Sequence, residues 1–180
     1  GCLLARRLAE ARVPYIQVNW SEYVETFSPN CDFGWDTHIF NFELLQDRHC
    51  PILDRAYSAL IDDLSDRGML DDTLVVAIGE FGRSPQRGVS TSGNSNSDDG
   101  RDHWPYCYTA IAACAGVKRG FVYGESDKTG SAPLRDPVHP TEMLATMYHS
   151  VGINPNSIVY NHLNQPRELV KADPVTAIFS

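Results

Sequence analysis

Hydrophobic residues recur along this chain at two spacings, and each spacing predicts a different kind of element. Between Pro51 and Gly68 the apolar side chains recur every three or four positions, and aspartates occupy the opposite face, as in an amphipathic helix. Pro51 suits the first turn of that helix and Gly68 its C-terminal cap. The same helical spacing predicts three further helices, at residues 2–12, 43–49 and 139–152.

Short runs in which nearly every residue is apolar predict buried strands instead. The clearest run is TLVVAIG, residues 73–79, and the segments VPYIQVNW (13–20) and YCYTAIAACAG (106–116) share its character. Residues 117–136 favour a short hairpin. Because strands alternate with helices, we expect an α/β domain with a mostly parallel sheet, in which ligands bind beyond the C-terminal ends of the strands.

One internal segment is poor in apolar residues. Residues 84–100, SPQRGVSTSGNSNSDDG, consist mainly of Ser, Gly, Asn and Asp and have little to bury. A connection of this length is unusual within a compact domain. We therefore expect a flexible loop insertion, either a lid or a disordered segment.

Length and charge narrow the classes of partner. The 180 residues suffice for one domain or for part of a larger one. The net charge of −8 argues against a nucleic-acid partner, because phosphate backbones bind basic surfaces. We also expect no membrane partner, since no apolar run reaches the ~18 residues of a membrane span. The five cysteines show no CxxC pair and are interpreted as mostly free thiols.

The start of the chain is helical from its first residues and has no Ser, Thr, Asp or Asn cap before it. This favours a fragment, the C-terminal part of a longer domain. An ordinary domain boundary is the alternative interpretation.

The segment FGWDTHIFNF carries the first candidate chemistry. Asp36 and His38 lie two residues apart in a predicted loop, so both side chains can point the same way and reach one ion. Carboxylate oxygen combined with imidazole nitrogen suits zinc or a similar divalent metal. A hydrogen-bonded Asp–His pair without metal is the alternative.

Two further polar clusters follow. Glu80 ends a predicted strand in GEFGR, where Arg83 can either contact a phosphate or sulfate or simply pair with Glu80. His103 lies in GRDHWP, and the preceding Asp102 can be a ligand, an acceptor that fixes the ring, or a turn residue. We interpret the other histidines, His49, His139, His149 and His162, as structural or surface residues. We therefore expect four metal ligands: Asp36, His38, Glu80 and His103.

The segments GWDTH, LDRAYSALIDDLSDRGMLDDTLVVAIGEFGRSP, GRDHWP and GVKRGFVYGESDKTG occur in this order. Together they resemble the domain-of-unknown-function 1501 family, which is similar to the alkaline phosphatase and sulfatase superfamily; the match covers about residues 1–155. The resemblance implies a three-layer α/β/α fold with a mostly parallel sheet. It also implies a two-metal site beyond the strand ends, next to a Ser, Thr or modified Cys nucleophile.

Position by position, the resemblance implies that Asp36, His38 and His103 bind one metal and that Glu80 binds the other. Two features depart from the superfamily pattern: Phe81 stands where His is usual, and Asp36 and His38 are closer in sequence than the corresponding pair. The superfamily's nucleophile lies nearer the N-terminus than these motifs. We therefore expect residues 1–180 to form the C-terminal portion of a single alkaline-phosphatase-like domain, an incomplete one.

The leading hypothesis from the sequence is a metal-dependent hydrolase of small anionic phosphate or sulfate esters, with Arg83 contacting the anion and the nucleophile region lacking. Zinc is the expected metal, with calcium or manganese as alternatives. The rival hypothesis is a non-catalytic relative that binds a ligand or partner, which Phe81 and the long polar loop favour. By family resemblance alone, we expect a periplasmic or secreted protein.

Overall fold

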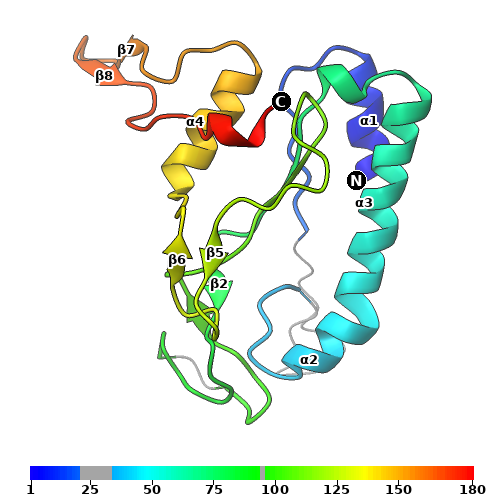
Figure 1. Ribbon diagram of the computed structural model, residues 1–180, viewed down its shortest axis with the longest axis vertical. Coiled ribbons are helices and arrows are strands. Elements are labelled where there is room, and N and C mark those ends of the chain that lie inside the picture. The colour runs from blue at the N-terminus through cyan, green and yellow to red at the C-terminus, as the bar shows by residue number, and fades with distance from the viewer. Residues whose placement is uncertain (21–33, 94–95) are drawn as a thin grey trace.

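The computed structural model describes residues 1–20, 34–93 and 96–180. Its helices within these ranges are α1 (Cys2–Glu10), α2 (Asn41–Leu44), α3 (Cys50–Asp66) and α4 (Pro140–Ser150). Other helical turns are the π-helical η1 (Leu45–His49) and the 3-10 turns η2 (Leu70–Asp72) and η3 (Thr176–Ile178). Figure 1 shows α3 along one side of the molecule with α1 beside it, while the labelled strands and α4 lie on the other side.

The strands of the described residues pair two by two, and every pair is antiparallel. The pairs are β1 (Val75–Ala77) with β4 (Ile111–Ala113), β2 (Gly82–Arg83) with β3 (His103–Trp104), β5 (Glu125–Ser126) with β6 (Pro133–Arg135), and β7 (Ile158–Tyr160) with β8 (Pro166–Glu168). No parallel pair occurs among these residues, and each strand is only two or three residues long. The three-layer fold with a parallel sheet therefore stays a prediction.

The predicted helices are confirmed, and their ends follow from local chemistry. Pro51 lies in the first turn of α3, which continues from α2 through the π-helical turn η1. At the other end Gly68 adopts φ +65°, the left-handed conformation that favours glycine. The Gly68 N–H donates to the Ser65 carbonyl at 2.9 Å and the Met69 N–H to the Leu64 carbonyl at 2.8 Å, so the last carbonyls of α3 are satisfied.

Helix α4 begins at a capping box. Glu142 accepts a hydrogen bond from the His139 N–H at 2.6 Å, and the His139 ring accepts one from the Thr141 N–H at 3.3 Å. His139 thus has the structural role expected of it. Gly152 follows the helix at φ +78° and ends it in the same way as Gly68 ends α3.

Buried side chains are more often polar than apolar. The buried hydrophobic residues of the described chain are Leu44, Leu64, Met143, Ala145 and Val170. Most buried polar residues of the described chain instead come from two segments, residues 34–49, which include α2 and η1, and residues 84–102. Hydrogen bonds therefore hold these two regions, which carry the predicted site.

Two sequence predictions of strands need correction. The predicted buried strand at 13–20 is wrong: those residues form no strand, and Val13, Tyr15 and Val18 are exposed. An apolar run shows that a segment could pair, but not that a partner strand is available to it. Of the predicted strand 106–116, only Ile111–Ala113 pairs with another strand. It ends there because Cys114 and Ala115 adopt positive φ.

Other predictions have mixed outcomes. The β5–β6 pair confirms the hairpin expected in 117–136. The described residues of 84–100 form no helix or strand, and their flexibility stays a prediction.

The described cysteines are free thiols: Cys2, Cys50, Cys107 and Cys114. Cys31 lies outside the described residues. No helix in the described chain has both the length and the apolar character needed to cross a bilayer.

Candidate metal centre

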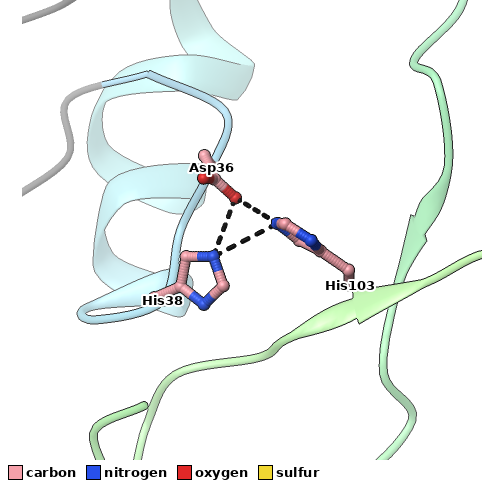
Figure 2. A group of neighbouring side chains, drawn as sticks. All are labelled: Asp36, His38 and His103. Atoms are coloured by element: carbon pink, nitrogen blue, oxygen red, sulfur yellow. Dashed lines mark hydrogen bonds and ion pairs between the residues drawn. The ribbon is translucent and has the colours of Figure 1, made fainter. Parts of the chain in front are cut away.

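Three of the four predicted ligands come together from two distant segments. Asp36 and His38 lie on the loop before α2, and His103 opens β3 (Figure 2). Strand pairing places Arg83 of β2 directly opposite His103. The short β2–β3 ladder therefore brings one imidazole and one guanidinium to the loop that carries Asp36.

The donor atoms form a small triangle. Asp36 Oδ1 lies 2.8 Å from His103 Nε2 and 3.0 Å from His38 Nε2, and the two Nε2 atoms are 3.2 Å apart. An ion about 2.0–2.2 Å from each donor, at tetrahedral angles, would need edges of roughly 3.3 Å. The three donor–donor distances are slightly shorter than that value. A small outward movement of the side chains would therefore let the three atoms bind a zinc-sized ion.

The loop that carries Asp36 and His38 is fixed at both ends. The buried His49 ring bonds to the Gly34 carbonyl at 2.7 Å and packs on the Trp35 ring at 5.1 Å between centroids. The fully buried Thr37 hydroxyl donates to Asn41 Oδ1 at 2.6 Å. His49 is thus structural, as expected, and Asp36 and His38 are held by their neighbours rather than by each other alone.

Arg83 has protein partners in this structure. Its Nη2 atom donates to Asp36 Oδ1 at 2.7 Å and to the Trp35 carbonyl at 2.6 Å. Partial burial raises the pKa of Asp36, but hydrogen bonds from His103 and Arg83 and the positive charge of Arg83 outweigh it, so the net pKa lies below the usual range. Asp36 is therefore held as a carboxylate, the form that binds a metal.

Glu80, the fourth predicted ligand, does not join this group. Its side chain is exposed, and the metal-capable cluster of the described residues comprises only Asp36, His38 and His103. Its neighbour Phe81 does reach the site, with its ring 4.4 Å from the His103 ring. A second metal on Glu80 stays a prediction.

A family model described as "Protein of unknown function (DUF1501)" matches residues 1–179. The chain belongs to the DUF1501 family. Searches of curated proteins and of solved structures return no match.

The DUF1501 site also uses a buried carboxylate whose role the sequence left open. Asp102 is fully buried and accepts hydrogen bonds from the N–H groups of Thr91, Ser92 and His103 at 2.6–2.9 Å. The Ser92 hydroxyl donates a further bond, at 2.6 Å. Burial raises the pKa of Asp102, but these donors outweigh it and hold the pKa far below the usual range. Asp102 is therefore an anchor for the backbone around His103.

The polar segment 84–100 supplies hydrogen-bond partners of His38 that its residue pattern does not predict. Asn96 Oδ1 lies 2.8 Å from His38 Nδ1, and the Ser97 N–H donates to the His38 carbonyl at 3.2 Å. The run of small polar residues has no periodicity, so nothing in its pattern indicates which side chain faces inward. The signal available was its position, immediately before GRDH.

Proposed function

We propose that this DUF1501 chain binds one divalent metal, zinc in preference to calcium or manganese, through Asp36, His38 and His103. The observation that carries the proposal is the convergence of three donor atoms within 3.2 Å of one another from loops 65 residues apart. Two imidazoles and one carboxylate are ligands typical of a zinc site that keeps an open position. Calcium prefers six to eight oxygen ligands, which this group does not offer.

We further propose that the site serves the hydrolysis of small anionic phosphate or sulfate esters. Kinship to alkaline phosphatases and sulfatases, with their three-layer fold, is suggested by the order of the sequence motifs and belongs to this proposal. When bound, a divalent cation supplies Lewis-acid polarisation of an ester oxygen. Asp36 and the two histidines bring their donor atoms together, and the Arg83 guanidinium, beside Asp36, is placed to neutralise an anionic group.

Metal analysis of the intact chain tests the binding step. We expect about one equivalent of zinc in the wild type. Asp36→Ala and His103→Ala should lose it, because each variant keeps only two of the three protein ligands and so binds zinc weakly. His162→Ala is the control, since that histidine is exposed and outside the cluster. Equal zinc content in all four proteins would contradict the proposal.

A second candidate function is metal-supported binding without turnover. The observation that favours it is Phe81, whose ring packs on His103 where the superfamily usually has a histidine ligand. Aryl phosphates and aryl sulfates, tested on the intact protein with and without zinc, separate the two candidates. Hydrolysis is supported if the phenol is released only with metal and if Asp36→Ala abolishes that release. The second candidate is supported if the same esters bind tightly but are not cleaved.

A further inference from the structure

The two nitrogens of the His38 ring face different surroundings. Nε2 is one of the three atoms of the donor triangle and lies 3.0 Å from Asp36 Oδ1 (Figure 2). Nδ1 points the opposite way, 2.8 Å from Asn96 Oδ1 and 3.7 Å from Asp102 Oδ1. Which nitrogen carries a proton decides which one can bind a metal, because only an unprotonated nitrogen is a ligand.

The orientation of the Asn96 amide decides this question. Asn96 Nδ2 donates to the Val89 carbonyl at 3.3 Å, which leaves Oδ1 facing His38. An amide oxygen only accepts hydrogen bonds, so the proton between the two side chains belongs to His38 Nδ1. The carboxylate of Asp102, on the same side, is also an acceptor and favours the same arrangement.

We propose that Asn96 is a positioning residue of the metal centre: by accepting the Nδ1 proton of His38, it leaves Nε2 free to bind the cation. This arrangement sets two acceptor atoms, His38 Nε2 and Asp36 Oδ1, 3.0 Å apart. Such atoms repel each other unless a proton or a cation lies between them. Asn96 thereby prepares the site for a positive charge.

Described residues on either side of positions 94 and 95 support both histidines. Asp102 accepts hydrogen bonds from the backbone N–H groups of Thr91, Ser92 and His103. Asn96 contacts the ring of His38. Hydrogen-bonded partners of this kind orient metal ligands, and their loss typically weakens metal binding by roughly 10- to 100-fold.

Nitrogen-15 NMR of the histidine rings in the intact protein tests the proton assignment, and zinc titration tests its consequence. In the wild type we expect His38 Nδ1 to be protonated with and without zinc. Asn96→Leu removes the acceptor at similar volume; we expect the Nδ1 proton to be lost from a large share of molecules and zinc to bind roughly 10- to 100-fold more weakly. Asn96→Asp keeps the acceptor, so it should retain both properties.

Gln86→Leu is the matched control, because it removes an exposed amide from the same polar segment. The inference rests on the proposed metal site for its effect on affinity, but the proton assignment is measured without metal. Wild-type protein that binds no zinc would refute the proposed function and, with it, the effect of Asn96 on affinity, while the metal-free NMR result would still test the proton assignment. Unchanged Nδ1 protonation and zinc affinity in Asn96→Leu would refute this inference alone. If Asn96→Leu unfolds, Asn96→Asp decides: weaker zinc binding in that folded variant overturns the role of Asn96.

Discussion

At Gly100 the chain passes so close to His38 that no side chain fits. A Cβ atom at this position would overlap the carbonyl oxygen and carbon of His38. Both are backbone atoms, so the clash is relieved only by separating the Gly100 segment from the loop that carries Asp36 and His38. We expect Gly100→Ala to weaken zinc binding at least tenfold and to cost about 1–3 kcal/mol of unfolding free energy. Isothermal titration and urea unfolding measure the two effects.

Gly79→Ala provides the comparison for that substitution. A Cβ on Gly79 meets only the Phe81 carbonyl oxygen, at an ordinary 3.5 Å, and the residue has no left-handed φ. We therefore expect nearly wild-type zinc binding from Gly79→Ala. If the two glycine variants behave alike, close contact at Gly100 is not what positions His38.

A second prediction concerns the contribution of Asp102 to stability. Its two oxygens accept four hydrogen bonds in a fully buried position. Asp102→Asn replaces one acceptor oxygen with an NH₂ group that faces donors, so at least one buried N–H loses its partner. We expect a loss of about 1–3 kcal/mol in urea unfolding with chelator present, which removes any contribution from metal. The exposed Asp173→Asn should change stability little, and an equal loss there would argue against the anchor role.

Individual site residues were predictable where residue type and spacing carry chemistry. Asp36, His38 and His103 stood out as metal-capable side chains next to loops, and the structure brings them together. Glu80 also carries a carboxylate and follows a predicted strand, but its side chain is exposed. The end of a strand predicts where such a residue lies and does not predict where its side chain points. Asn96 was unpredictable, since its partner is 58 residues away in sequence.

Among the elements, α1 and α3 are joined by charge. Arg6 donates to Asp63 at 2.6 Å and Arg67 donates to Asp63 and Glu10 at 2.7 Å, while Leu3 and Leu4 of α1 are exposed. Hydrogen bonding by Arg67 and then Arg6 outweighs partial burial and holds the pKa of Asp63 below its usual value. The attachment of α1 should therefore depend on pH and on salt.

The sign of this dependence follows from the lowered pKa. Asp63 stabilises the fold fully above its unfolded pKa of about 3.9, and the effect disappears as the pH falls through the lower folded value. We expect Asp63→Asn to unfold at lower urea than wild type at pH 6, with the difference vanishing at strongly acidic pH. The neighbouring exposed Asp62→Asn should show little difference at pH 6. A gap for Asp63→Asn that persists in strong acid would contradict the ion-pair explanation.

Helices were predictable from the sequence, whereas strands were predictable only in part. A helix forms its backbone hydrogen bonds within one segment, and particular residues mark where it begins and ends. Pro51 and Gly68 mark the two ends of α3. A strand needs a partner that the local sequence does not name. Residues 13–20 and 73–79 are both rich in apolar residues, yet only the second contains a paired strand.

For the molecule as a whole, the accessible surface is larger than its mass predicts. A compact monomer of 20.0 kDa exposes about 8,700 Å². This chain exposes 12275 Å². Large apolar side chains contribute much of that surface, including Val122 at 82% and Leu134 at 71% exposed, on either side of β5 in the sequence. Surface of this kind usually associates with other apolar surface.

We therefore expect the 180-residue chain to associate with itself and to bind a hydrophobic dye, because burying exposed apolar area is favourable by about 25 cal/mol per Å². Replacing both side chains, Val122→Ser with Leu134→Ser, should lower dye fluorescence and shift sedimentation toward the monomer. The matched control is Lys128→Ser with Ser126→Ala, which changes polar positions of the same hairpin. A chain that sediments as a compact monomer without dye binding would show that the apolar surface is covered in solution by the chain itself. Reduced association in the first double variant, and not in the second, would place the associating surface at this hairpin.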